Sequence, residues 1–255
     1  MAPIVLALVI VDVWTFALLT AAGAVFMSLE WRDLITARFD QTAGNLAGMA
    51  AGAAAVLVIL MMAMGWAELA LLLALFCASA SGLMATLAGG SAFWTIIGVL
   101  YLSLPMLALV WLRALPENGL AMTIWLLMVV WAADVVAYFT GRGIGGPRLA
   151  PSISPGKTWS GFCGGMAGAL VIGALVTMIN GPFRILTALL LAAGMAVAAQ
   201  VGDLAESALK RRAGVKDAGT LIPGHGGLLD RVDGLLFAAP VLAVVALLAG
   251  GLGQP

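Results

Sequence analysis

The chain has 255 residues, of which 63% are hydrophobic and 9% are charged, and its formal net charge is zero. Its mean hydropathy of +1.12 excludes an ordinary soluble globular domain. The balanced charge gives no indication of nucleic-acid binding, and the number and spacing of the two cysteines, Cys77 and Cys163, indicate packing residues and no disulfide or metal site. The composition therefore predicts an integral membrane protein.

Apolar stretches follow one another along the whole chain, and stretches of about 20 residues cross a bilayer as helices. The first stretch fits either one tilted helix or an imperfect helical pair, and it lacks the features of a cleaved signal peptide. The predicted fold is an all-α polytopic membrane protein with a polar loop region. We expect eight spans, at residues 4–29, 45–64, 66–87, 92–112, 119–140, 160–180, 183–202 and 234–252.

Lys and Arg residues are distributed unevenly over the loops between these spans. The odd-numbered loops hold ten of the twelve, and the even-numbered loops hold two, Arg113 and Arg184. Short loops rich in Lys and Arg face the cytoplasm. We therefore expect the odd-numbered loops, including the one at residues 203–233, to face the cytoplasm and both termini to lie outside.

Two acidic residues fall inside predicted spans. Asp134 lies about two turns from the cytoplasmic end of the fifth span, with Tyr138 one turn later. An ionisable group at that depth is costly and marks a functional candidate. Asp12, in the first span, is compatible with an interface position or with a cavity, and the sequence does not choose between them.

The charge of the chain is concentrated in residues 200–233, which hold ten of its 24 Lys, Arg, Asp and Glu residues. Asp203, Glu206, Ser207 and Lys210 have the spacing i, i+3, i+4 and i+7, which places them along one face of a helix. A carboxylate, a hydroxyl and an ammonium in a row can hold a metal ion together with an anion. Gly214 is a suitable residue to end this helix.

A glycine-rich turn and a second acidic pair complete this segment. His225, Gly226 and Gly227 lie in a run with little side-chain bulk, where backbone N–H groups can approach a phosphate. Asp230 and Asp233 flank Arg231, which suits a hard cation bridging to phosphates and an arginine that clamps an anion. A merely solvated loop is the alternative, but such a loop requires neither the glycine run nor acids at helical spacing.

Together these residues resemble the signature of the phosphatidate cytidylyltransferase family, the bacterial CDP-diacylglycerol synthases. Ala218 stands where the family often has Ser. Two further segments are similar to the family: residues 133–142 to its D-x-x-A-Y-x-x-G-[RK] segment, and residues 154–161 to S-P-x-K-T-x-E-G, with Gly156 in place of Lys and Ser160 in place of Glu. The matching signature positions are Gly202-Asp203-Leu204, Glu206-Ser207, Lys210-Arg211, Lys216-Asp217, Gly219 and Pro223 to Asp233.

The resemblance implies transfer of a cytidylyl group from CTP to phosphatidate in the bacterial inner membrane. It implies Mg²⁺, with room for a second cation, held first by Asp203 and Asp230, then by Asp233. It also implies a homodimer, and a division into N-terminal spans, residues 1–112, and a catalytic membrane region, residues 113–255. Further catalytic residues would be Ser207 and Lys210, and the substrate-binding residues would be Asp134, Tyr138, Ser154, Lys157, Thr158, Arg211, Lys216, His225, Gly226, Gly227 and Arg231.

Three other interpretations remain open. A CTP-dependent polyprenol or lipid kinase also combines membrane spans with acidic and basic loops, although the full G-H-G-G-x-x-D-R-x-D run favours the cytidylyltransferase. A transporter would place charges or broken helices at mid-membrane in paired halves, whereas these charges gather on one side. A catalytically silent scaffold is the third, because of Gly156 and Ser160.

Overall fold

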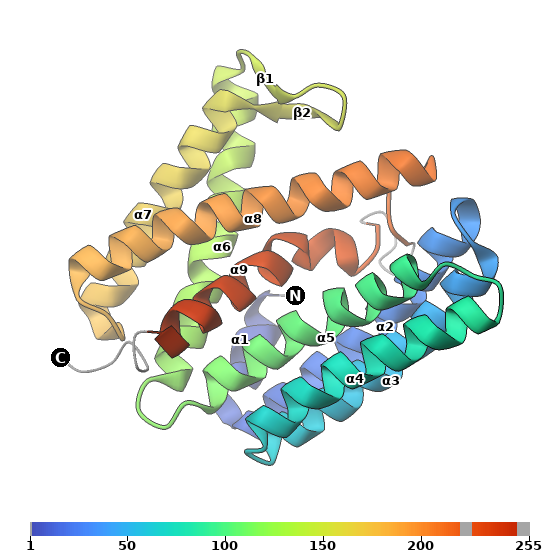
Figure 1. The fold of residues 1–255 in the computed structure, drawn as a ribbon. Coiled ribbons are helices and arrows are strands. Elements are labelled where there is room, and N and C mark those ends of the chain that lie inside the picture. The colour runs from blue at the N-terminus through green and yellow to red at the C-terminus, as the bar shows by residue number, and fades with distance from the viewer. Residues whose placement is uncertain (1, 220–225, 249–255) are drawn as a thin grey trace. The chain divides into compact units, whose positions relative to one another are not determined.

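The computed structural model describes residues 2–219 and 226–248 (Figure 1). Within these residues the chain forms nine helices and one two-stranded sheet, and eight of the helices are long and apolar enough to cross a membrane. The predicted all-α polytopic fold with eight spans is confirmed. The helices are α1 (Ala2–Val11), α2 (Val13–Arg38), α3 (Gln41–Ala63), α4 (Ala67–Leu87), α5 (Ala92–Ala114), α6 (Gly119–Ile144), α7 (Trp159–Asn180), α8 (Ile185–Ala213) and α9 (Leu229–Leu248), and the strands are β1 (Arg148–Ala150) and β2 (Ser154–Thr158).

The first apolar stretch is a helical pair, α1 and α2, and only α2 is long enough to span a membrane. Asp12 separates the two helices and caps α2, because its carboxylate accepts hydrogen bonds from the Thr15 backbone N–H at 2.7 Å and the Thr15 hydroxyl at 2.8 Å. These hydrogen bonds lower the pKa of the Asp12 carboxyl below its ordinary value. The sequence left the role of Asp12 open, and the structure makes it a helix cap.

The chain folds into two compact units. The first comprises Met1–Ala114 and Leu209–Val232, and the second comprises Leu115–Ala208 and Asp233–Pro255. The predicted division between residues 112 and 113 stays a prediction. Helices α8 and α9 each contribute residues to both units.

Small residues allow close helix packing in the first unit. Helix α3 lies against α2, α4 and α5. A Cβ atom at Gly48 would lie 2.5 Å from Cβ of Arg32, and one at Gly52 would lie 2.6 Å from Oγ of Ser28. The two glycines therefore let α2 and α3 approach more closely than larger residues would permit.

Small residues also allow close helix packing in the second unit, where α7 packs against α6. A Cβ atom at Gly165 would lie 2.8 Å from the backbone oxygen of Ala133, and one at Gly168 would lie 2.7 Å from Val136. Trp125 of α6 is buried, and its indole N–H donates to the backbone oxygen of Gly173 at 3.0 Å. Gly165 and Gly168 are therefore packing residues of this helix pair.

A short antiparallel hairpin, β1 and β2, precedes α7 (Figure 1). Arg148 pairs with Thr158, and Ala150 pairs with Ser154. Thr158 then caps α7 by accepting a hydrogen bond from the Gly161 N–H at 3.1 Å. This segment was expected to be an irregular polar loop. Its strands are too short, and too rich in proline and glycine, to show the alternation by which strands are recognised.

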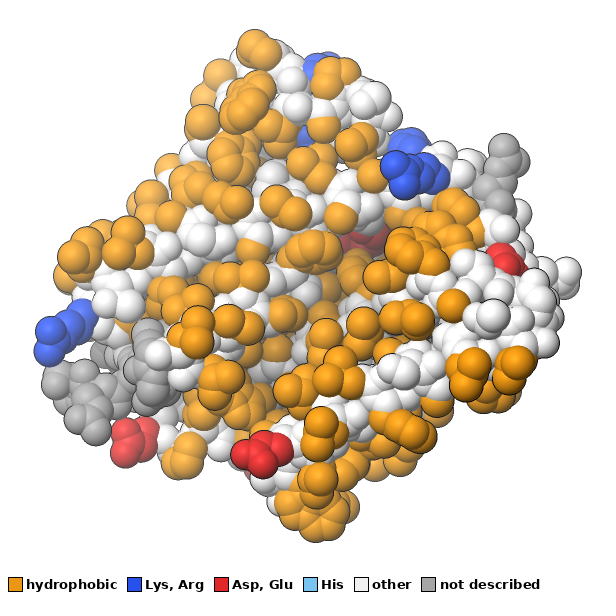
Figure 2. Space-filling view, viewed as in Figure 1, with side chains coloured by type: hydrophobic (Ala, Val, Ile, Leu, Met, Phe, Trp, Pro, Cys, Tyr) orange, Lys and Arg blue, Asp and Glu red, His pale blue; other side chains and the backbone are white. Residues whose placement is uncertain are grey.

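Hydrophobic side chains cover most of the visible surface, and charged side chains are sparse (Figure 2). Large exposed side chains include Phe76 on α4, Ile179 on α7 and Leu190 on α8. Soluble monomers rarely expose apolar surface on this scale. The fold therefore suits a bilayer, where such side chains meet lipid.

The glycine packing predicts opposite effects of two Gly→Ala substitutions. Gly165→Ala places a methyl group against the backbone of α6 and should destabilise the protein by about 1–3 kcal/mol. Gly194→Ala lies in open space within α8 and should stabilise by up to about 1 kcal/mol through helix propensity. Thermal unfolding of the purified protein in detergent measures both, and equal shifts would contradict the packing account.

Candidate active site

An ion pair joins two segments of the second unit that are far apart in sequence. The ammonium of Lys157, on β2, meets the carboxylate of Asp203, on α8. The hydroxyl of Ser207 donates to the same carboxylate at 3.3 Å, one helical turn further along α8. The structure thus places Lys157, Asp203 and Ser207 together, as expected if they serve one site.

Three more acids surround this pair in the second unit. Asp134 of α6 lies within electrostatic reach of Asp203 and Lys157. Asp233 of α9 lies within reach of Asp203, Glu206 and Asp134. A Cβ atom at Gly202 would lie 2.5 Å from the backbone oxygen of Asp233, so a glycine at this position of α8 permits the approach of α9. Asp134, Asp203, Glu206 and Asp233 therefore form one acidic cluster, of which Asp203 and Asp134 lie within reach of Lys157.

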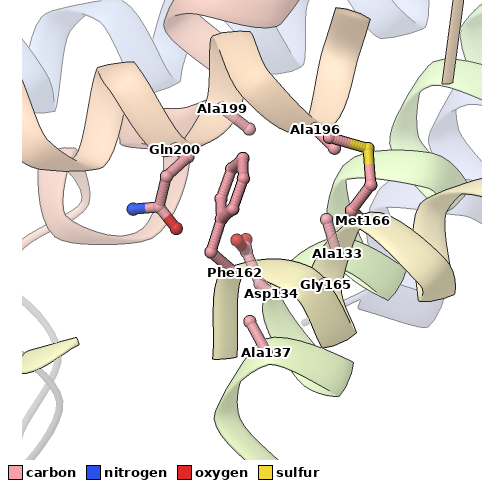
Figure 3. Close-up of a pocket in the computed structure, with 9 residues that line it drawn as sticks. All are labelled: Ala133, Asp134, Ala137, Phe162, Gly165, Met166, Ala196, Ala199 and Gln200. Carbon is pink, nitrogen blue, oxygen red and sulfur yellow. The ribbon is translucent and has the colours of Figure 1, made fainter. Parts of the chain in front are cut away.

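A pocket opens beside these groups (Figure 3). Asp134, Phe162 and Gln200 project from three different helices into this pocket, and its remaining walls are small or apolar. The amide nitrogen of Gln200 is buried and has no hydrogen-bond partner among the described residues. A buried donor of this kind is costly unless a ligand or water accepts from it. The pocket is lined by Ala133, Asp134, Ala137, Phe162, Gly165, Met166, Ala196, Ala199 and Gln200.

Tyr138 does not share the position of Asp134. Its side chain is 58% exposed, and its hydroxyl accepts a hydrogen bond of 2.7 Å from the guanidinium of Arg142 on the same helix. Of the two predicted wall residues on α6, Asp134 lines the pocket and Tyr138 does not.

A second ion pair lies in the first unit, between Lys210 of α8 and Asp230 of α9. The other carboxylate oxygen of Asp230 accepts hydrogen bonds from the N–H of Ala218 at 2.9 Å and of Gly227 at 2.8 Å. Gly214 ends α8 in the left-handed conformation, with φ +74°, as the sequence predicted. Both oxygens of Asp230 are therefore occupied by protein donors.

Glu30 of α2 is the residue of this region that the sequence interpretation missed. Its carboxylate accepts hydrogen bonds from the N–H of Leu228 at 2.7 Å and of Leu229 at 2.8 Å. The sequence showed Glu30 only as an acidic residue at the end of an apolar span. Acidic residues are common at solvated helix ends, so this position did not indicate a role. A contact across 198 residues leaves no pattern in the sequence.

The remaining predicted substrate-binding residues differ in how exposed they are. Thr158 is buried as the cap of α7, whereas Ser154 lies at the start of β2 and is only half-buried. Arg211, Lys216 and Arg231 are exposed, and the guanidinium of Arg211 donates to the backbone oxygen of Val215 at 3.4 Å. His225 lies outside the described residues, while Gly226 and Gly227 are within them.

The chain matches the model described as the cytidylyltransferase family over residues 1–249. The chain belongs to this family. It is 40% identical over 254 residues to the phosphatidate cytidylyltransferase of Pseudomonas aeruginosa, a match that covers 94% of this chain and 90% of that protein. The resemblance inferred from the signature residues is confirmed.

Two further relatives are also named phosphatidate cytidylyltransferase. That of Brucella abortus (strain 2308) is 47% identical over 153 residues, or 58% of this chain and 55% of the relative. That of Bacillus subtilis (strain 168) is 43% identical over 132 residues, or 51% of this chain and 49% of the relative. The chain spans about half the length of these two relatives.

The described acids differ in how well they suit a divalent cation. Among the described residues no three His, Cys, Asp or Glu side chains are arranged to enclose a metal ion. Mg²⁺, however, needs only one or two protein carboxylates beside substrate phosphates. In the second unit, Asp203 and Asp233 lie among more carboxylates than Lys157 alone can neutralise. This surplus of oxygen donors and negative charge fits such a cation.

The buried pair of Lys210 and Asp230 predicts a stability difference between two matched substitutions. Lys210→Met leaves a buried carboxylate without its ammonium and should destabilise the protein by about 3–5 kcal/mol. Arg32→Met breaks the exposed pair of Arg32 and Asp33 and should cost about 0–1 kcal/mol. Thermal and denaturant unfolding measure both, and equal losses would contradict the burial of the Lys210 pair.

Proposed function

We propose that the protein transfers the cytidylyl group of CTP to phosphatidate, giving CDP-diacylglycerol and pyrophosphate. The observation that carries the proposal is the match to the Pseudomonas aeruginosa phosphatidate cytidylyltransferase over 90% of that protein's length. The contacts of Lys157, Asp203 and Ser207 support it, because they gather an ammonium, a carboxylate and a hydroxyl from separate signature segments.

The chemistry requires charge neutralisation more than a general base. A phosphate monoester has a second pKa near 6, so phosphatidate already carries a nucleophilic dianion at neutral pH. One of its oxygens forms a bond to the α-phosphorus of CTP, and the bond between that phosphorus and the oxygen bridging to the β-phosphorus breaks. Pyrophosphate departs with the electron pair. Positioning and cationic groups supply most of the catalysis in such transfers.

The chain's cationic and hydroxyl side chains take the phosphate-binding role in this proposal. Lys157, Ser207, Lys210 and Arg211 would contact phosphate groups of the substrates. Lys216 and Arg231 would add positive charge, and His225 would position the substrate. Asp134 and Gln200 would line the part of the site that holds uncharged atoms of the substrate.

The acids of the signature are proposed to hold Mg²⁺, with room for a second cation. Asp203 is supported by the surplus of carboxylates around it, and Asp233 lies within its reach. Asp230 is assigned from its spacing with Asp233 beside Arg231 and from the family resemblance, and its present hydrogen bonds would have to rearrange to admit a cation. A bound Mg²⁺ would neutralise charge on the triphosphate.

The proposed location of the protein rests on its charge distribution and on its relatives. The excess of Lys and Arg in the odd-numbered loops supports a cytoplasmic face for the signature segments, where CTP is available. The bacterial relatives support the cytoplasmic membrane as its site. In a bilayer the acyl chains of phosphatidate would remain among the helices throughout the reaction. A homodimer is part of the proposal on the family resemblance alone.

The proposal predicts which variants lose activity. Wild-type protein in detergent, with CTP, phosphatidate and Mg²⁺, should form CDP-diacylglycerol detectable by mass spectrometry, and chelation of Mg²⁺ should abolish the product. Lys157→Met and Asp203→Asn should each lower kcat/KM by about 100-fold or more, because Lys157 would neutralise phosphate charge and Asp203 would hold the cation that does so. Asp33→Asn, at an exposed acid, is the matched control and should retain activity. Full activity of Asp203→Asn would overturn the role of that carboxylate.

A further inference from the structure

The carboxylate of Glu30 is buried and directed at the start of α9. Glu30 is only 6% exposed. Its two carboxylate oxygens accept separate hydrogen bonds from the backbone N–H groups of Leu228 at 2.7 Å and Leu229 at 2.8 Å. A carboxylate at a helix N-terminus is favoured by the helix dipole and by charge-assisted hydrogen bonds. Glu30, which belongs to α2, therefore caps the N-terminus of α9.

The same carboxylate explains why two signature positions are glycine. A Cβ atom at Gly219 would lie 2.8 Å from Cγ and Oε1 of Glu30, and one at Gly227 would lie 2.7 Å from its Cδ and Oε1. Neither glycine has the left-handed backbone found at Gly226, where φ is +81°. Gly219 and Gly227 are therefore required for space, and the space is occupied by Glu30.

Three successive backbone N–H groups at the start of α9 are directed at protein carboxylates. Gly227 donates to Asp230, and the next two residues, Leu228 and Leu229, donate to Glu30. The glycine-rich turn was expected to present such N–H groups to a phosphate. In this structure the anions that they hold are the chain's own acids, so substrate phosphates would be met by Lys and Arg side chains.

Helix α2 contacts the turn at a second point. The Cβ position of Gly23 lies 3.7 Å from the Leu228 side chain, and Gly23 precedes Glu30 by seven residues. Residues seven apart lie on one face of a helix. One face of α2 therefore lies along the turn, close to Leu228 at Gly23 and hydrogen-bonded to its backbone through the Glu30 carboxylate.

We propose that Glu30 is a positioning residue for the proposed reaction, which fixes the backbone of residues 226–230 and thereby the carboxylate of Asp230. The inference rests on the proposed function. It assigns to a residue outside the three signature segments the task of holding the glycine-rich turn. Its effect on catalysis passes through Asp230, which Lys210 and two backbone N–H groups hold in turn.

The first test is Glu30→Gln, which keeps the shape of the side chain but replaces one acceptor oxygen by a donor. The substitution should lower kcat by about 10–100-fold, the usual effect of removing a group that orients another, and leave the KM for phosphatidate unchanged. Hydrogen exchange at the amides of Leu228 and Leu229 should accelerate while that of α6 stays unchanged. Glu68→Gln, at an exposed acid in the first turn of α4, should do neither.

The second test uses the steric contact and is independent of how well Glu30→Gln folds. Gly227→Ala alone should lower kcat, because its methyl group meets Glu30. In a Glu30→Ala background the methyl group meets no carboxylate, so adding Gly227→Ala should cause no further loss. Losses that multiply, or unchanged amide exchange in Glu30→Gln, would overturn the inference. If the wild-type protein forms no product, the proposed function fails, and the exchange measurement still decides whether Glu30 holds the turn.

Discussion

The cost of burying charge in an apolar chain governs the rest of this structure. Only 9% of the residues are charged, and several of those that lie among the helices have specific partners. Lys157 pairs with Asp203, Lys210 pairs with Asp230, and Glu30 accepts from two backbone N–H groups. Each of these contacts ties together segments that are distant in sequence, so the positions of the ion pairs also fix the local geometry of the candidate site.

Much of the fold could be predicted from the sequence because membrane spans and helix periodicity are local signals. Hydropathy gave the eight spans, and the spacing of Asp203, Ser207 and Lys210 predicted the helix that carries them. Hydropathy alone marks neither the polar turns at the end of α8, which the spacing of the polar residues predicted, nor those at the start of α9. The hairpin at residues 148–158 escaped prediction, and a helical pair at the start of the chain was only one of two alternatives, because a short strand and a cap depend on single contacts.

The candidate site could be predicted in its members but not in its contacts. The resemblance named Lys157, Asp203 and Asp230, and the structure pairs the first two with each other and the third with Lys210. Gly227 was expected to bind a phosphate through its backbone N–H. In the structure this N–H donates to Asp230, and the absence of a side chain at Gly227 leaves room for Glu30. Such dual roles arise from long-range contacts, which a single sequence does not record.

The fate of the phosphorus atoms of CTP tests the central claim most directly. CTP labelled with ³²P at the α-position, or separately at the γ-position, would be given to the purified protein with phosphatidate and then with a polyprenol. The account predicts that α-label enters the phosphatidate-derived lipid and that γ-label leaves as pyrophosphate. Transfer of γ-label to either lipid would identify a kinase, and retention of both labels in the nucleotide by folded protein would contradict the account altogether.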